Sequence, residues 1–134
     1  MRFLVTSAAA VALLVCSSVQ AQEGPDVSGK WANTSWGVVD LKVTDRKDEK
    51  GVVVGKDAAG TYTSSNGKVS GELQGSTLEG YWMQPHSSVA CKTKQGGTAY
   101  WGRLRLTFDG DKFTGHWGYC DEVPDHRGVS GQRS

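Results

Sequence analysis

The sequence lacks an excess of charge of either sign. Lys and Arg number 15 and Asp and Glu number 14, for a formal net charge of +1 at pH 7. No basic run is present to bind a phosphate backbone, and no polybasic segment to bind an anionic membrane. We therefore do not expect nucleic acid as a partner, which leaves a small molecule or another protein.

The chain also lacks an apolar run long enough to span a bilayer. Its most apolar stretch, AAAVALLV at 8–15, is well short of the ~20 residues of a spanning helix, so stable membrane insertion is not expected. Arg2 precedes this stretch, and the small residues of VQA at 19–21 follow it, as in a secretory signal peptide. We expect cleavage after Ala21.

The alternative to a signal peptide is a lipoprotein anchor on Cys16. Such signals place a small residue immediately before the cysteine, where this chain has Val15, so we favour the signal peptide. The sequence thus predicts a cleaved segment at 1–21, a single domain at 22–134, and a secreted or periplasmic location. It leaves the oligomeric state open.

Cysteine is scarce, with 3 residues in the whole chain. Cys16 leaves with the signal peptide, so Cys91 and Cys120 remain as a pair in an exported protein. An oxidising compartment favours a disulfide over a metal-bound or nucleophilic thiol. We expect Cys91 and Cys120 to form a disulfide bond.

Sustained helical periodicity is absent from residues 22–134, which contain all 18 glycines of the chain in scattered positions. Period-two alternation is present instead, as in GRLRLTF at 102–108, where glycine, leucine and phenylalanine alternate with arginine and threonine. We expect about eight strands, near 27–32, 37–44, 51–63, 68–74, 77–83, 99–108, 112–119 and 128–133. Short connections and the cost of open edges predict an all-β fold, a closed antiparallel up-and-down barrel.

A glycine recurs between two larger residues in several of these strands. The pattern is clearest in VSGKW at 27–31, LEGYW at 78–82 and FTGHW at 113–117. Glycine weakens a strand, so its repeated use indicates crowding, since a missing side chain makes room for a large inward one in a small barrel. We interpret the repeat as a packing device rather than a ligand motif.

An up-and-down barrel sends alternate connections to the same end. One end receives short charged turns such as DRKDEK at 45–50, and the other receives the long segments 84–98 and 120–128. Cys91 and Cys120 fall in these two long segments, so the topology brings them together. Because long loops on a rigid scaffold commonly carry binding sites, we expect function at this end.

The loop-rich end carries no recognised catalytic or metal-binding motif. Its titratable residues, which show no HxH, HExxH or EF-hand spacing, are His86, His126, Asp121, Glu122 and Asp125. Ser87 and Ser88 lack the motif that surrounds a hydrolase nucleophile. We therefore expect no enzyme activity, no metal and no cofactor.

The aromatic residues allow two interpretations. Trp31, Trp82 and Trp117 occupy the last position of the glycine pattern, and inward tryptophans of a small barrel usually fill its interior. Alternatively, some of them line a cavity at the loop-rich end, where the hydroxyls of Tyr62 and Tyr119 orient a ligand.

Two segments are similar to the avidin and streptavidin family of small secreted barrels. GKWAN at 29–33 resembles the opening strand of that family, and GTYTS at 60–64 resembles a segment of its third strand. The resemblance implies an avidin-like or lipocalin-like barrel in which Asn33, Tyr62 and Ser64 contact a ligand. The final strand, VSGQRS, lacks the late tryptophans and aspartate of that family, so biotin is a minor alternative. The chain also looks like exported bacterial barrels rich in Trp and Gly.

These observations predict an exported, disulfide-stapled barrel that binds a small organic ligand at its loop-rich end. The expected ligand-binding residues are Asn33, Trp36, Tyr62, Ser64, Trp82, Trp117 and Tyr119. The alternative is a protein-interaction or enzyme-inhibitor module that uses loops 84–98 and 120–128. Outward-facing Trp101 and Tyr81 would add an aromatic patch for such a partner.

Overall fold

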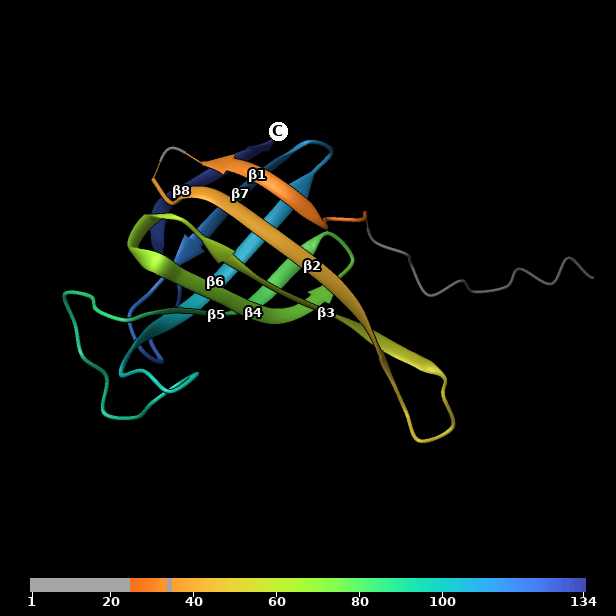
Figure 1. Cartoon of the computed structure of the whole chain (residues 1–134), viewed down its shortest axis with the longest axis horizontal. Coiled ribbons are helices and arrows are strands. Elements are labelled where there is room, and N and C mark those ends of the chain that lie inside the picture. The colour runs from red at the N-terminus through yellow and green to blue at the C-terminus, as the bar shows by residue number, and fades with distance from the viewer. Residues whose placement is uncertain (1–24, 34) are drawn as a thin grey trace, which may run out of the picture.

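Eight antiparallel strands close into one barrel in the computed structural model of the chain, which describes residues 25–33 and 35–134 (Figure 1). Each strand pairs with its neighbours in sequence, and β8 closes the barrel against β1. The strands are β1 (Gly29–Asn33), β2 (Gly37–Lys47), β3 (Val53–Tyr62), β4 (Gly67–Gln74), β5 (Thr77–Gln84), β6 (Tyr100–Asp109), β7 (Lys112–Trp117) and β8 (His126–Arg133). The up-and-down barrel predicted from the sequence is confirmed, and the expected signal peptide at 1–21 lies outside the described residues.

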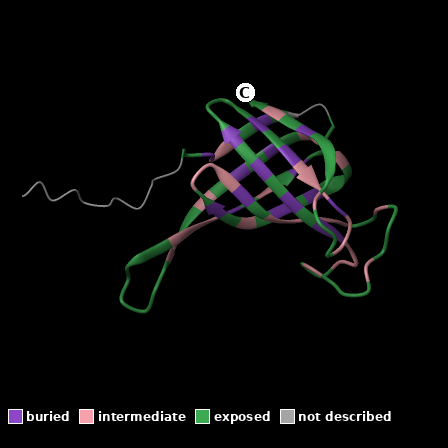
Figure 2. Cartoon of the chain, turned by 180° about the vertical axis from the view of Figure 1, so that it is seen from behind, coloured by how far each residue is buried: buried purple, intermediate pink, exposed green. Residues whose placement is uncertain are grey.

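Strand β6 shows how the sequence alternation builds the barrel wall. Leu104, Leu106 and Phe108 are at most 3% exposed, whereas Arg103 and Arg105 between them are exposed. Figure 2 shows the same alternation of buried and exposed residues around the barrel. Because successive residues of a strand face opposite sides, one face of the sheet fills the interior and the other meets solvent.

The prediction that the glycines of the repeat make room for large inward side chains is confirmed at Gly115 and Gly131. A Cβ atom on Gly131 would lie 2.3 Å from the ring of Phe113. One on Gly115, the glycine of FTGHW, would lie 2.4 Å from the side chain of Leu106. Both separations are far shorter than carbon–carbon contact, so a larger residue at either position would displace the core. At Gly60, Gly71 and Gly80 a Cβ atom would first meet a backbone carbonyl of the neighbouring strand, at 1.9–2.3 Å, and at Gly29 it would meet no atom nearer than 3.5 Å.

Trp31 fills the barrel at the end that has the short turns. It is fully buried, and its indole Nε1–H donates a hydrogen bond to the Val27 carbonyl at 3.0 Å. The rings of Phe108 and Phe113 lie edge-on to it, with centroids 5.2 and 5.6 Å away. This packing leaves the interior filled rather than hollow at that end.

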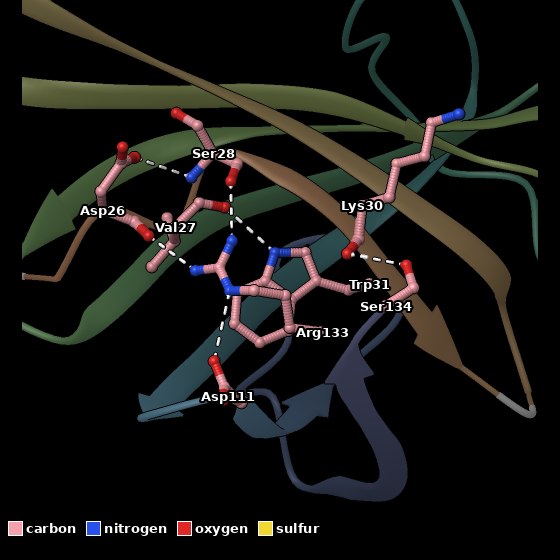
Figure 3. Close-up of polar contacts among 8 residues, drawn as sticks. All are labelled: Asp26, Val27, Ser28, Lys30, Trp31, Asp111, Arg133 and Ser134. Atoms are coloured by element: carbon pink, nitrogen blue, oxygen red, sulfur yellow. Dashed lines mark hydrogen bonds and ion pairs between the residues drawn. The ribbon is translucent and has the colours of Figure 1, made fainter.

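Arg133, the last residue of β8, seals the same end (Figure 3). Its guanidinium donates hydrogen bonds to the backbone carbonyls of Ser28 at 2.8 Å and Asp26 at 2.7 Å. It also lies 4.3 Å above the Trp31 ring, and its Nε is 3.5 Å from the Asp111 carboxylate. Both ends of the described chain are thereby fastened over the barrel floor.

The β2–β3 hairpin continues beyond the barrel wall, in yellow at the lower right of Figure 1. Strand β1 pairs with β2 no further than Leu41, and β4 pairs with β3 no further than Lys56. The sequence placed the strand end at residue 44, but β2 runs on to Lys47 because it pairs with β3 alone beyond the barrel. The valines at 52–54 near the tip are 48–57% exposed.

Trp101 points outward from β6 but is not a surface residue. It is 3% exposed, and its indole Nε1–H donates to the Thr93 carbonyl at 2.8 Å. The β5–β6 loop at 85–99 therefore covers it, while Tyr81 packs against it with ring centroids 5.6 Å apart. The expected exposed patch of Trp101 and Tyr81 is wrong, because the long loop folds back over the barrel wall.

Candidate functional site

The two ends of the barrel differ as the sequence predicted. The β1–β2, β3–β4, β5–β6 and β7–β8 connections meet at one end, and the last two of these are the longest, at 85–99 and 118–125. The opposite end has short turns and the floor built around Trp31 and Arg133. The loop-rich end is therefore the better candidate for a ligand site.

A disulfide joins the two long loops. Cys91 and Cys120 are bonded, with their Cα atoms 5.5 Å apart, which confirms the expected pair. The backbone N–H of Cys120 donates to the Trp101 carbonyl at 2.9 Å, and that of Cys91 donates to the Ala99 carbonyl at 2.7 Å. The first bond fixes the 118–125 loop to β6, and the bond from Trp101 Nε1–H to the Thr93 carbonyl fixes the 85–99 loop to the same strand. The disulfide indicates an oxidising compartment.

A pocket of about 410 Å³ opens at this end of the barrel. Four of the expected ligand-binding residues line it, namely Trp36, Trp82, Trp117 and Tyr119. They come from the β1–β2 connection, from β5, from β7 and from the loop after β7. Residues distant in sequence therefore meet at one mouth, which the alternating topology predicts.

The rest of the pocket wall is polar, and none of its residues is among the ligand contacts expected from the sequence, although His86, Ser87 and Ser88 were placed at this end of the barrel. Its residues are Ser65, Gln84, His86, Ser87 and Ser88. A signal for Gln84 existed, because it follows inward Trp82 by two positions on β5. The loop residues had no such signal, since no strand pattern extends into the segment that carries them.

Three aromatic rings of the pocket stand nearly perpendicular to one another. The planes of Trp82 and Trp117 meet at 82°, those of Trp82 and Tyr119 at 75°, and those of Trp117 and Tyr119 at 86°. Their centroids are 5.1–6.1 Å apart. Trp82 is held in place by a hydrogen bond from its Nε1–H to the Gly118 carbonyl at 3.0 Å. The rings form a rigid corner rather than a flat platform.

Other rings support this corner from behind. His126 stacks on Trp117, with ring centroids 4.4 Å apart and planes at 19°, and its Nε2 lies 3.8 Å from the Asp125 carboxylate. Across the pocket, Trp36 stacks on Tyr62, with centroids 4.6 Å apart. Each supported ring has one face covered by its partner and contributes the remainder to the pocket wall.

Tyr62 lies behind the pocket rather than in its wall. It is 2% exposed, and its hydroxyl accepts a hydrogen bond from Nε2 of Gln84 at 2.7 Å. Burial raises the pKa of Tyr62 to about 12, because desolvation disfavours the phenolate. The side chain is thus a neutral phenol that positions Trp36 and Gln84.

A further expected contact, Ser64, is not in the pocket wall, and the expected contact of Asn33 stays a prediction. The sequence analysis placed Ser64 on a strand with Tyr62, but β3 ends at Tyr62 and Ser64 begins the 3-10 turn η1 (Ser64–Asn66). Ser65, with a left-handed φ of 59°, lines the pocket instead. Asn33 is the last residue of β1 and pairs with Gly37, and its side chain lies outside the described part of the chain.

The described residues offer no catalytic constellation at this mouth. Across 25–33 and 35–134, no three His, Cys, Asp or Glu side chains are grouped to hold a metal ion. Ser87 and Ser88 share the wall with His86, but within that part of the chain neither hydroxyl is hydrogen-bonded to the imidazole. The same residues contain no helix with the length and apolarity to cross a bilayer.

A larger groove of about 640 Å³ runs over the outer faces of β3 to β6. Its charged side chains are paired, since Arg105 Nε lies 2.9 Å from the Glu79 carboxylate and Arg46 bridges Asp57 and Glu72. These pairs are solvent-exposed, and the groove lacks the rigid aromatic walls of the mouth. We therefore place the candidate site in the smaller, aromatic pocket.

Comparison with known proteins finds no match to this chain. The chain matches no family model, no curated protein sequence and no solved structure. The resemblance of 29–33 and 60–64 to avidin-like barrels stays a prediction from the sequence, and the candidate site is defined by its own geometry.

Proposed function

We propose that this chain is an exported binding protein without catalytic activity, which holds a small organic ligand at the loop-rich mouth of its barrel. The observation that carries the proposal is the pocket of about 410 Å³, walled by Trp36, Trp82, Trp117 and Tyr119. Ligand sites are typically concave, largely pre-formed and rich in aromatic walls with a few polar groups. The disulfide beside the pocket reduces the ordering cost of binding.

The proposed ligand occupies the mouth and not a deep interior cavity. Trp31, Phe113 and Leu78 are at most 1% exposed and fill the interior below. Tyr62 is also buried, with its hydroxyl engaged by Gln84. We retain kinship to avidin-like barrels as part of this proposal, with a contact set that differs from the one that the resemblance implied.

Native mass spectrometry of the exported protein tests the proposal. We expect a discrete non-covalent adduct that survives purification, or that forms when a library of small organic molecules is added. Trp117→Leu should lose it, whereas Tyr81→Leu should keep it because Tyr81 lies on the outer face. A protein that acquires no adduct from any source, while its fold is intact by circular dichroism, overturns the proposal.

The second candidate is a protein-interaction or inhibitor module that presents the two stapled loops. Val89 and Val123 on these loops are 38% and 72% exposed, at the end where the disulfide fixes the backbone. The disulfide holds together the two loops that carry these residues, so both could be presented to one partner. Val89→Asp with Val123→Asp should abolish such a contact and leave small-molecule binding in the mouth intact.

A further inference from the structure

The corner of perpendicular rings restricts the shape of the group that it can hold. A planar heterocycle, or the flatter face of a sugar ring, stacks on a parallel aromatic platform. Here Trp82, Trp117 and Tyr119 meet at 75–86°, so a flat group that stacks on one ring meets the others edge-on. A compact, nearly spherical group suits such a corner better than a flat one does.

The chemistry of the wall restricts the charge of that group. Among the described residues that line the pocket there is no Lys, Arg, Asp or Glu, and His86 is its one basic side chain, so the wall offers no permanent cation to hold an anionic group. It also offers no carboxylate to replace the hydration shell of a primary ammonium, which is costly to strip. A quaternary ammonium, whose charge is covered by methyl groups, avoids that cost and is attracted to the electron-rich ring faces.

We infer that the pocket binds a small quaternary ammonium compound, with its methylated cationic head in the corner formed by Trp82, Trp117 and Tyr119. This inference rests on the proposed function, because it names the ligand class for the same pocket. The polar residues of the wall, among them Gln84, Ser87 and Ser88, suit a hydroxyl group at the other end of such a ligand.

A matched pair of probes separates the effect of a ligand's charge on its affinity from the effect of its shape. Choline carries the quaternary nitrogen, and 3,3-dimethylbutan-1-ol replaces that nitrogen with an uncharged carbon of the same shape. Titration of each, followed by tryptophan fluorescence and calorimetry, should show choline binding about tenfold tighter, the range that cation–π attraction supplies in a partly desolvated site. Equal affinities for the two probes overturn the inference.

Variants of the corner provide the second arm of the test. Tyr119→Phe keeps the ring and should keep the preference for choline, whereas Trp117→Leu and Tyr119→Leu should each remove it. Tyr81→Leu, the same kind of change on the outer face, should leave it unchanged. Two separate corner variants keep the test valid if one of them fails to fold, and a preference that survives both ring removals contradicts the inference.

The outcomes distinguish this inference from the proposed function. If choline does not bind but an uncharged or anionic adduct appears in native mass spectra and is lost in Trp117→Leu, the inference fails and the binding pocket stands. If neither probe binds and no adduct of any class is found, both fail. Competition between choline and the retained adduct, with displacement at stoichiometric occupancy, is the result that supports both.

Discussion

At the scale of single residues, one glycine makes a wall of the pocket possible. A Cβ atom on Gly102 would lie 1.8 Å from the Gly118 carbonyl oxygen and 2.5 Å from Nε1 of Trp82. That same nitrogen donates to the Gly118 carbonyl at 3.0 Å. The absence of a side chain at Gly102 thus allows the hydrogen bond that orients Trp82. Both the packing of the core and the shape of the proposed pocket therefore depend on Gly102.

Gly102→Ala should lower the free energy of unfolding by about 1–3 kcal/mol, the usual cost of forcing atoms into a packed core. Gly55→Ala is the matched control, because its Cβ would meet only the flexible end of Arg46 on the exposed hairpin. Chemical denaturation of both variants measures the difference. Equal stability of the two variants would show that Gly102 is not needed for steric reasons.

Tyr62 gives a prediction about pH. Its pKa is raised from 10.0 to about 12 in the folded protein, so below about pH 10 the phenol is protonated in both the folded and unfolded states. Between about pH 10 and 12 the unfolded state loses the proton and the folded state keeps it, so the free energy of unfolding falls as pH rises.

Tyr62→Phe removes this group, and its free energy of unfolding should fall less steeply over the same alkaline range. Denaturation curves for both proteins at several pH values measure the two slopes. The stability difference between wild type and variant should be constant below about pH 10 and shrink above it. Parallel curves through the whole range would contradict the assignment of Tyr62 as a buried phenol.

At the scale of structural elements, the β2–β3 hairpin and the barrel wall differ in how far they bury their valines. The valines at 52–54 are 48–57% exposed on a ribbon that has no neighbouring strand, whereas Val69 on β4 is 1% exposed. We therefore expect a buried valine to contribute more to stability than an exposed one, although both lie in segments with the same β propensity.

Replacing all three hairpin valines with threonine should change the free energy of unfolding by less than about 0.5 kcal/mol, as is usual at exposed sites. The single change Val69→Thr should cost about 1–3 kcal/mol, because it buries a hydroxyl in the barrel core. Thermal and urea unfolding compare the two variants. A large loss from the hairpin variant would mean that its tip packs against something.

The disulfide constrains elements that the strands alone do not hold. Replacing both Cys91 and Cys120 with serine should lower stability by about 2–4 kcal/mol and speed hydrogen exchange in the loop at 85–99. The binding affinity should fall as well, because His86 and Ser87 on that loop line the pocket. Intact mass before and after reduction provides the control, and free thiols in the untreated protein would contradict the bond.

At the scale of the whole molecule, the features predicted correctly from the sequence are those set by the alternation of residues in strands and by the order of the strands. The alternation in GRLRLTF placed Leu104 and Leu106 inside correctly, and alternate connections brought Cys91 to Cys120. The glycine repeat also predicted, at Gly115 and Gly131, where a side chain would collide with the core. Each of these follows from the alternation of residues along a strand or from the order of the strands.

Contacts made by irregular loops were the ones that could not be predicted. The cover of Trp101 depends on how the loop at 85–99 folds back, and no residue pattern encodes that path. Ser64 left the strand because Ser65 and Asn66 adopt left-handed φ angles of 59° and 49° in the turn. The polar wall of the pocket is likewise a product of loop placement.

The tryptophans can report where a ligand binds. The chain has 5 tryptophans, and the structure places Trp36, Trp82 and Trp117 in the pocket wall. Trp31 lies in the sealed floor and Trp101 lies beneath the β5–β6 loop, so both are remote from a ligand in the mouth.

The most direct test is therefore a titration of the ¹⁵N-labelled protein with choline, or with a ligand recovered from purification, followed by NMR of the indole N–H signals. The account predicts that the signals of Trp36, Trp82 and Trp117 shift together with one dissociation constant while those of Trp31 and Trp101 stay in place. Shifts confined to Trp31 or Trp101, or saturating binding that moves none of the three pocket signals, would contradict it.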